Sequence, residues 1–358
     1  MVARSATRGH CWNANAAPGS AGLNNFTRSH PGPVFASSLT LFGQWEIPEP
    51  ITGAVNRTFK LSIVECSESL KEQTMGHVLT DDQHQQYDRD GYVLARGAAG
   101  PEVLQLARVI LERWANEVIE SWVKQGLLKD PLGNVDFEHR LVQAWEAAGR
   151  PRYSRSPRRD LVSPEMYRFL AHPDLVKLAE DLLGTAEVSA HGIFNGRPKS
   201  PDQKWTDTPW HQDAQYFRDA EQVHVPALWI PLQPVTENNS CLQMAAGVHR
   251  GLLHEGYNDP ESEFLGMSPE ARAALKGISI EMQPGDVLCF TQKTPHRALP
   301  NLSTAMRWSM DVRYEATPTA TASGRQQGFV ARSRTHPQSV ETYGQWLKKW
   351  DGIPRGGY

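Results

Sequence analysis

The segment Thr208-Pro-Trp-His-Gln-Asp-Ala-Gln-Tyr-Phe217 places an imidazole and a carboxylate two residues apart, at His211 and Asp213. In an extended strand, residues i and i+2 point to the same face, so these two side chains can converge on one point. Two histidines and one carboxylate that leave coordination positions open are typical of non-haem Fe(II) oxygenases. We therefore predict that the end of one strand supplies two of three metal ligands.

The third ligand and a receptor for an organic anion are expected further along the chain. His296, in Thr294-Pro-His-Arg297, is the candidate ligand because it follows a predicted strand at Val287-Leu-Cys-Phe290. Arg307 and Ser309 share one face of a later predicted strand, and a guanidinium beside a hydroxyl suits a carboxylate. A metal next to such a receptor is what a 2-oxoacid cosubstrate requires.

The second half of the chain has the pattern of a β-structure. Short segments rich in apolar and β-branched residues alternate there with Gly, Pro and Asn turns, which predicts strands and a β-sandwich or jelly roll. The predicted strands are 187–194, 223–232, 241–245, 277–282, 287–291 and 307–314. The sequence Pro284-Gly285-Asp286 predicts a tight hairpin between two of them.

Helical signals dominate before and after this region. Thr80-Asp-Asp-Gln83 predicts a capping box, followed by a short strand at 91–95 and a long amphipathic helix from Pro101 to about Gly126. Further helices are expected at Pro164, from Pro173 to Gly184, and over 337–350, where Trp346, Leu347 and Trp350 should pack on the sheet. The expected fold class is α+β dominated by β. It has a double-stranded β-helix (jelly roll or cupin-like) core over about 186–315, with flanking helices, in a single domain of residues 76–358.

The first 75 residues differ in composition from the rest. No Asp or Glu precedes Glu46, whereas Arg4, Arg8 and Arg28 are present. This bias fits a disordered extension, translated sequence upstream of a true start at Met75, or a transit-like segment. We expect a cytoplasmic location, or a mitochondrial one if residues 1–45 are a transit peptide.

Composition narrows the class of protein further. The 358 residues are 39% hydrophobic and 22% charged with a formal net charge of −3, which argues against a nucleic-acid-binding surface. The four cysteines contain no CxxC pair, so neither a disulfide scaffold nor a structural zinc site is expected. No apolar run is long enough to span a bilayer. A small-molecule substrate and O2 are the expected partners, and the oligomeric state stays open.

Two features have competing interpretations. The basic segment 149–159 is either a solvated loop or a lid whose arginines meet an anionic substrate or cosubstrate. His224, His249 and His254 are interpreted as surface or core residues, because none of them belongs to the set formed by His211, Asp213 and His296.

Four ordered motifs together resemble the phytanoyl-CoA dioxygenase family. They are TPWHQDAQYF, NSCLQMAAGVHR at 239–250, the PHR and PNLS sequences around His296, and RWSMDVRY at 307–314. The resemblance covers about residues 78–335, beginning with LTDDQHQQYDRDGY at 79–92. Members of that family are Fe(II)- and 2-oxoglutarate-dependent oxygenases with a double-stranded β-helix core. Many relatives carry a lysine directly before a proline where this chain has Asn195-Gly-Arg-Pro-Lys199, so a cosubstrate contact from that lysine does not carry over.

The resemblance implies a role for each site residue. His211, Asp213 and His296 would bind iron, Arg307 would pair with the distal carboxylate of 2-oxoglutarate, and Ser309 would support it. The lining of the cosubstrate pocket would include Gln212 and Trp229. The presence of Asp213 favours hydroxylation or another oxidation, because related halogenases have a small residue at that position.

The implied reaction oxidises a small organic substrate and converts 2-oxoglutarate to succinate and CO2. Two alternatives remain open at this point. One is a metal-dependent cupin-type enzyme that does not use 2-oxoglutarate, which would usually show more histidine ligands and no need for Arg307. The other is a non-catalytic binding protein that has kept the jelly-roll fold.

Overall fold

The computed structural model describes residues 78–153, 158–201, 206–216, 223–260 and 262–355. All of them belong to the second of the two units into which the chain divides, Leu70–Tyr358. The predictions for residues 1–75 therefore lie outside the described residues. Within the described ranges, no helix combines the length and the apolar character that crossing a membrane requires.

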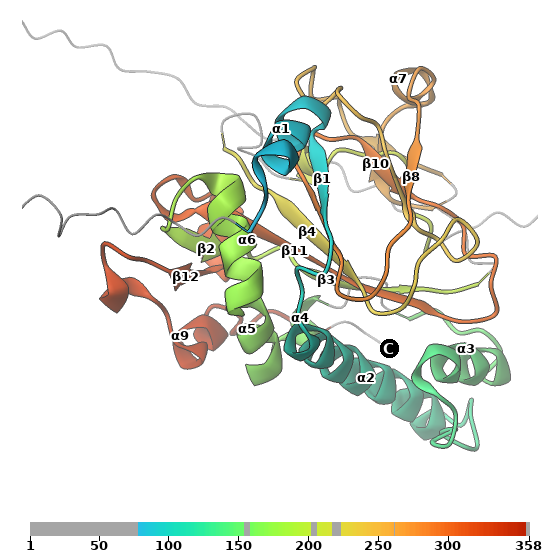
Figure 1. Cartoon of the computed structure of the whole chain (residues 1–358). Helices are drawn as coiled ribbons and strands as arrows, with labels where there is room; N and C mark the ends of the chain where they lie inside the picture. Colours follow the sequence, from blue (N-terminus) through green and yellow to red (C-terminus); the bar gives the residue numbers. More distant parts are fainter. Residues whose placement is uncertain (1–77, 154–157, 202–205, 217–222, 261, 356–358) are drawn as a thin grey trace, which may run out of the picture. The chain divides into compact units, whose positions relative to one another are not determined.

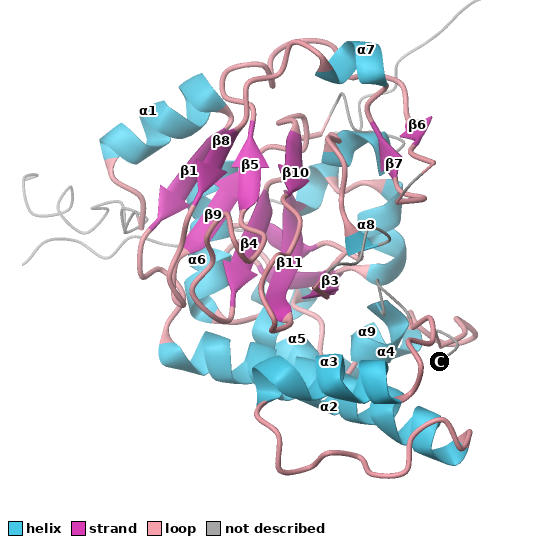
Figure 2. Ribbon diagram, turned by 90° about the vertical axis from the view of Figure 1, so that its right-hand side faces the viewer, coloured by secondary structure: helices cyan, strands magenta, loops and turns pink. Residues whose placement is uncertain are grey.

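Two antiparallel sheets form the core, as the jelly-roll prediction requires (Figures 1 and 2). The major sheet has the order β1 (Tyr92–Ala95), β9 (Val287–Phe290), β4 (Ala227–Pro231), β11 (Arg307–Ala316), β2 (Val188–Ala190), β12 (Phe329–Arg332), and β3 (Asn195–Lys199) also pairs with β11. The minor sheet has the order β10 (His296–Ala298), β5 (Leu242–Met244), β8 (Ile278–Ile280). A separate pair consists of β6 (Tyr257–Asn258) and β7 (Leu265–Gly266).

Strand β11 separates a polar face from an apolar one. Trp308, Met310, Val312 and Tyr314 belong to the large core cluster shared with the helices. Arg307, Ser309, Asp311 and Arg313 alternate with them and are also buried. Because alternate residues of a strand face opposite sides, these four polar side chains point toward the space between the two sheets. The strand thus supplies both core and site.

Helices cover the apolar face of the major sheet (Figure 2). The helices of all the described residues, whether or not they cover this face, are α1 (Asp81–Asp90), α2 (Pro101–Lys124), α3 (Phe137–Ala147), α4 (Arg158–Leu161), α5 (Pro164–Leu170), α6 (Pro173–Leu183), α7 (Pro269–Arg272), α8 (Ala322–Gln327) and α9 (Tyr343–Lys348). The 3-10 turns are η2 (Asp213–Tyr216), η3 (Thr317–Thr319) and η4 (Pro337–Ser339). The capping box at Thr80 and Gln83 is confirmed, with both reciprocal bonds present. The predicted stripe of α2 is buried, and Trp114 on it makes an edge contact with Trp308 of β11.

Gly91 allows α1 to end against the turn that precedes His296. It has a φ of +82°, which suits glycine, and a Cβ there would come within 2.5 Å of Thr294 Oγ1. The Gly91 carbonyl accepts from the backbone N–H of Thr291 at 2.9 Å and from the Thr294 hydroxyl at 2.6 Å. This close approach fixes the turn from which β10 emerges.

Several predicted elements differ from the structure. The predicted strand 187–194 is shorter than expected: β2 ends at Ala190, because the ring of His191 accepts a hydrogen bond from the backbone N–H of Ile193 and turns the chain before β3 begins at Asn195. Residues Pro284–Asp286 do form a turn, with Gly285 at a φ of +97°. However, this turn joins β8 of the minor sheet to β9 of the major sheet, so it is not a hairpin.

The predicted terminal helix 337–350 is shorter than expected. Glu341 donates from its backbone to Val330 of β12 at 3.1 Å, which keeps the segment before α9 out of a helix. Trp346 and Trp350 are nevertheless buried, and their ring centroids lie 6.0 Å and 5.6 Å from that of Phe194. The ring centroid of Trp346 also lies 5.4 Å from that of Phe329 on β12, and Leu347 packs against the same core cluster, so the predicted packing is confirmed. The elements that were not predicted are strands β3, β6, β7, β10 and β12 and helices α3, α4, α7 and α8.

Candidate metal and cosubstrate site

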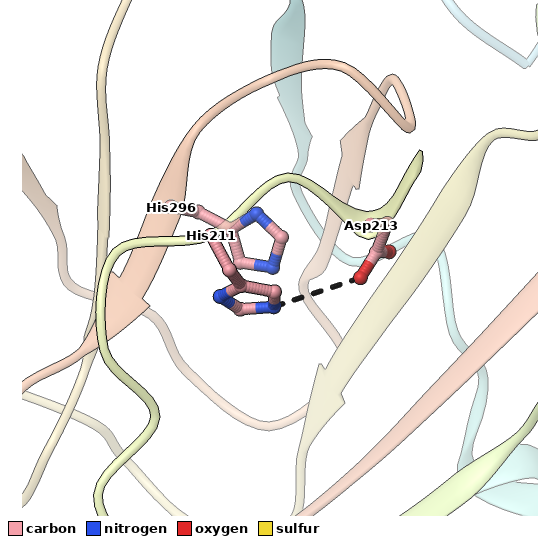
Figure 3. Close-up of side chains that lie close together, drawn as sticks. All are labelled: His211, Asp213 and His296. Carbon is pink, nitrogen blue, oxygen red and sulfur yellow. Dashed lines mark ion pairs between the residues drawn. The ribbon is translucent and has the colours of Figure 1, made fainter. Parts of the chain in front are cut away.

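His211 and His296 are held side by side by an isolated β-bridge. The backbone N–H of each donates to the carbonyl of the other at 3.0 Å, and the two ring centroids are 4.1 Å apart. The prediction that Asp213 continues an extended strand is wrong, because Asp213 begins the 3-10 turn η2. The turn still brings Asp213 Oδ1 to 3.6 Å from His211 Nε2 (Figure 3). The structure therefore brings the predicted pair together, although its local geometry differs.

The donor atoms of His211, Asp213 and His296 all lie within 4.8 Å of one another. Each Nδ1 is hydrogen-bonded to a backbone carbonyl, at 2.9 Å from Pro209 for His211 and at 3.0 Å from Thr294 for His296. A carbonyl only accepts, so each Nδ1 carries the hydrogen and each Nε2 keeps its lone pair. These two imidazoles are therefore prepared to act as metal ligands through Nε2.

Burial and neighbouring charges set the pKa values of His296 and Asp213. Burial, with His211 next to it, lowers the pKa of His296 to about 3, so that ring is neutral near pH 7. Burial alone would raise the pKa of Asp213, but the Arg313 guanidinium outweighs it and holds that pKa well below its usual range. Two histidines and one carboxylate match the ligand set of Fe(II). We therefore find that these residues fit an iron ion.

Arg313 orients the carboxylate ligand. Its Nε and Nη2 donate to Asp213 Oδ2 at 2.9 Å and 2.7 Å, while its Nη1 donates to Asp311 Oδ1 at 2.8 Å. Asp311 also accepts from Arg197 Nε at 2.8 Å and from Asn195 Nδ2 at 2.7 Å. A buried network of alternating charges thus holds Asp213. Arg313 lies on the same face of β11 as Arg307, and no role was predicted for it.

Arg307 lies in the same cavity as the two histidines. We call the space lined by His211, His296, Trp229, Arg307 and Lys199, among others, the Arg307 cavity. Arg307 Nη1 donates to Ser309 Oγ at 2.6 Å, and its Cζ is 5.3 Å from the centroid of the Trp229 ring. Its Nε is buried and has no hydrogen-bond partner among the described residues. This unsatisfied donor is what a bound carboxylate would satisfy.

Of the two other residues predicted to line the cosubstrate pocket, Trp229 lies on the Arg307 cavity and Gln212 does not. Trp229, on β4, lines the Arg307 cavity as predicted. Gln212 does not line it: its amide donates to the carbonyl of Lys293 at 2.9 Å, and its oxygen accepts from the backbone of His254 at 2.9 Å. The side chain of Gln212 therefore connects loops, because residue i+1 of the ligand pair faces away from the site.

Lys199 is a cavity residue that the sequence left open. Strand β3 is in register with β11, so that Lys199 lies opposite Arg307 and Asn195 opposite Asp311. The buried Lys199 ammonium pairs with Asp207, and burial lowers its pKa to about 8 although Asp207 opposes the shift. Only the pairing register reveals this position, because period-2 alternation alone cannot say which strand lies beside β11.

The fold and the site together define a class of protein. A double-stranded β-helix with two histidines, one carboxylate and a buried guanidinium between its sheets is the arrangement of an iron(II)- and 2-oxoglutarate-dependent oxygenase. The family model for phytanoyl-CoA dioxygenase (PhyH) matches residues 87–309, and the chain belongs to this family. The resemblance inferred from the four motifs is thereby confirmed.

Individual relatives are distant. Phytanoyl-CoA dioxygenase, peroxisomal, of Mus musculus is 23% identical over 266 residues, which cover 72% of this chain and 75% of the relative. The 1-deoxypentalenic acid 11-beta-hydroxylase of Streptomyces arenae is 26% identical over 241 residues, 64% of this chain and 78% of the relative. The crystal structure of EctD from S. alaskensis with 2-oxoglutarate and 5-hydroxyectoine has 20% identity and a TM-score of 0.47, covering 70% of this chain and 80% of that one.

Proposed function

We propose that this oxygenase hydroxylates, or otherwise oxidises, a small organic substrate with His211, Asp213 and His296 as its iron ligands. The reaction would consume O2 and 2-oxoglutarate and release succinate and CO2. One oxygen atom would enter succinate, and the other would enter the substrate or leave as water. The four electrons that O2 takes up come in two pairs, one from the decarboxylation and one from the substrate.

The observation that supports this proposal is the lining of the Arg307 cavity. His211 and His296 share it with Arg307, so one dicarboxylate can reach the metal ligands with one end and the guanidinium with the other. Arg307 is fixed by Ser309 and by the face of Trp229, and a buried arginine of this kind can grip a carboxylate with two parallel hydrogen bonds. A cupin-type enzyme without an oxoacid has no use for this guanidinium.

Each residue has a separate task in this function. Iron, when bound, supplies the activation of O2 that no side chain provides. His211 and His296 present unprotonated Nε2 atoms to it, and Arg313 keeps Asp213 ionised and turned toward them. Arg307 and Ser309 orient the cosubstrate. Burial of all three ligands excludes bulk water from the reacting groups.

The substrate is assigned only as a small organic molecule. The two curated relatives described above are named for phytanoyl-CoA and for 1-deoxypentalenic acid, which differ greatly in size and head group. Their common feature is an apolar carbon skeleton with an acid-derived group. A small-molecule substrate for this chain agrees with both names.

Anaerobic binding followed by turnover tests the proposal. The purified full chain is loaded with Fe(II) and 2-oxoglutarate without O2, and the visible charge-transfer absorption of the iron–oxoacid chelate is recorded. On admission of O2, succinate release is measured in the native protein and in His296→Ala. We expect the rate of succinate release by the variant to fall by more than about a hundredfold. Loss of a residue that only supports a metal ligand costs up to about a hundredfold, and loss of the ligand itself should cost more.

His139→Ala is the matched control, because His139 lies on α3 and is 40% exposed. We expect this variant to match the native protein in both measurements. Iron retention without succinate release would favour a cupin-type enzyme. Absence of both from the native chain would instead favour a non-catalytic binding protein.

A further inference from the structure

Arg158 lines a second cavity that adjoins the metal ligands. We call this space, lined by Arg158, Ile193, Tyr216, Phe264, His211 and Asp213 among others, the Arg158 cavity. It shares His211, Arg197 and Arg313 with the Arg307 cavity. The two cavities therefore meet at the candidate iron ligands, and the Arg158 cavity is the space left for the molecule that is oxidised.

The guanidinium of Arg158 has no carboxylate partner among the described residues. Its Nε donates to the carbonyl of Phe194 at 3.2 Å, and its Nη2 is 3.4 Å from the amide oxygen of Asn195. Both acceptors are neutral. Its remaining N–H groups donate to none of the described residues, so they are available to a ligand in the cavity.

The segment that carries Arg158 is anchored in the core. Leu161, at the other end of α4, is fully buried, and Arg113 of α2 donates to the carbonyl of Asp160 at 3.1 Å. Gly196 of β3 lets α4 approach the sheet, because a Cβ there would be 3.1 Å from Leu161 Cδ1. This end of the basic segment is therefore a fixed part of the cavity wall, whereas Arg152 is 75% exposed.

The charges around the cavity leave one positive charge uncompensated. Arg197 pairs with Asp311, and Arg313 pairs with both Asp311 and Asp213. Three guanidinium groups thus face two carboxylates. Burial, and then Arg313 and Arg197, lower the pKa of Arg158 to about 10, so Arg158 is still charged near pH 7. An anionic ligand would restore the balance at low dielectric.

The rest of the wall suits a carbon skeleton. Ile193, Phe264 and Tyr216 line the same cavity as Arg158 and the metal ligands. A molecule whose anionic group meets Arg158 would lay its apolar body against these side chains. Its C–H bonds would then face His211 and Asp213. This combination of one uncompensated charge and apolar side chains is typical of small-molecule sites.

We propose that Arg158 is the specificity-determining residue of this oxygenase and that the substrate is a small organic acid, bound through its carboxylate or a similar oxyanion. This inference rests on the proposed function, since it assigns the substrate class of the same site. Arg158 binds the acid group and thereby sets which carbon lies near the iron ligands. It takes no part in binding iron or 2-oxoglutarate.

Paired acids and esters test the inference. Decanoate and cyclohexylacetate, their methyl esters, and decylphosphonate are titrated calorimetrically into the full chain loaded anaerobically with Fe(II) and 2-oxoglutarate. We expect each acid to bind at least about tenfold more tightly than its ester, since hydrogen bonds to a charged group contribute about 1.5–3 kcal/mol. Tighter binding of the phosphonate than of decanoate would identify a phosphonate as the oxyanion.

Two variants assign the preference to Arg158. Arg158→Gln should weaken acid binding about ten- to a hundredfold and leave ester binding unaltered, while Arg158→Lys should restore part of the acid preference. Arg152→Gln, in the same basic segment, should behave as the native protein. The inference is overturned if no acid binds more tightly than its ester, or if Arg158→Gln keeps the preference.

The absorption of the iron–oxoacid chelate distinguishes failure of the proposed function from failure of the assignment of Arg158. If the native chain lacks this signal, the proposed function fails. If the signal is present and acids show no advantage over esters, only the assignment of Arg158 fails.

Discussion

Arg313 directs two hydrogen bonds to the same oxygen of Asp213: its Nε lies 2.9 Å and its Nη2 2.7 Å from Oδ2. The other oxygen, Oδ1, faces His211 Nε2 at 3.6 Å. One oxygen is thus reserved for the arginine and one for the metal. Asp213 would therefore present Oδ1 to a bound metal, and Arg313 fixes the orientation of the carboxylate.

We predict that Arg313→Gln weakens metal binding about ten- to a hundredfold, because partners that orient a ligand contribute that much to affinity. The free energy of unfolding should also fall by about 3–5 kcal/mol, since Asp213 and Asp311 would lose a buried partner. Anaerobic Fe(II) titration and denaturant unfolding measure the two effects. Arg313→Lys keeps the charge but lacks the fork, so it should fold and still bind iron about tenfold more weakly than the native chain. Native affinity in both variants would contradict this role.

Arg307 should act on the cosubstrate and not on the metal. We predict that Arg307→Lys raises the KM for 2-oxoglutarate about ten- to a hundredfold, because a lysine cannot replace the two parallel hydrogen bonds of a guanidinium. Fe(II) affinity without 2-oxoglutarate should stay at the native value, since Arg307 donates to Ser309 and Ser240 and not to a ligand. Succinate release over a range of 2-oxoglutarate concentrations gives the KM. An equal loss of iron affinity would show that Arg307 has a structural task instead.

The sequence revealed those site residues whose pattern is local or whose spacing is regular. The HxD pair was recognisable because its members are two apart, and Arg307 and Ser309 because a strand alternates its faces. His296 could be selected only because a jelly roll brings distant strands together. The expected strand geometry of Asp213 was wrong. The isolated bridge pairs only His211 with His296, and a 3-10 turn begins at Asp213.

The remaining site residues depend on tertiary pairing. Lys199 reaches the Arg307 cavity only because β3 is in register with β11, and nothing local to Asn195–Lys199 specifies that register. Arg158 is one of several arginines in a basic segment, and its neighbours in sequence do not distinguish it. The packing of Leu161, the last residue of α4, against Gly196 selects Arg158, because that contact brings α4 against β3.

Lys199 should make cosubstrate binding sensitive to alkaline pH. Burial lowers its pKa to about 8, so its positive charge is present below that pH and is lost as the pH rises through it. The dianionic cosubstrate then loses an attractive charge beside Arg307. We predict that the KM for 2-oxoglutarate rises by up to about tenfold between about pH 7 and pH 9.

The charge-retaining variant Lys199→Arg provides the comparison, because a guanidinium stays protonated over this range. Its KM should be nearly constant where that of the native protein rises. Steady-state succinate release at each pH, with Fe(II) saturating, supplies the measurement. A flat profile for the native chain, or the same rise in both proteins, would rule out Lys199 as the titrating group.

Gly196 should be intolerant of even one added methyl group. A Cβ at this position would lie 2.3 Å from Leu111 Cδ2 and 3.1 Å from Leu161 Cδ1, and both leucines are fully buried. We predict that Gly196→Ala lowers the free energy of unfolding by about 1–3 kcal/mol, as overpacking of a core does. Gly133→Ala is the control, since no heavy atom lies within 4 Å of the methyl it would add.

A double-mutant cycle with Leu111→Ala distinguishes this steric clash from a general loss of flexibility at Gly196. Leu111→Ala alone should cost about 2–5 kcal/mol by leaving a cavity. In the double variant the new methyl group would occupy part of that space. Its loss of unfolding free energy should therefore be smaller than the sum of the two single-variant losses by more than about 0.5 kcal/mol. Strictly additive costs in denaturant unfolding would mean that Leu111 is not the side chain that limits the approach of α2 to β3.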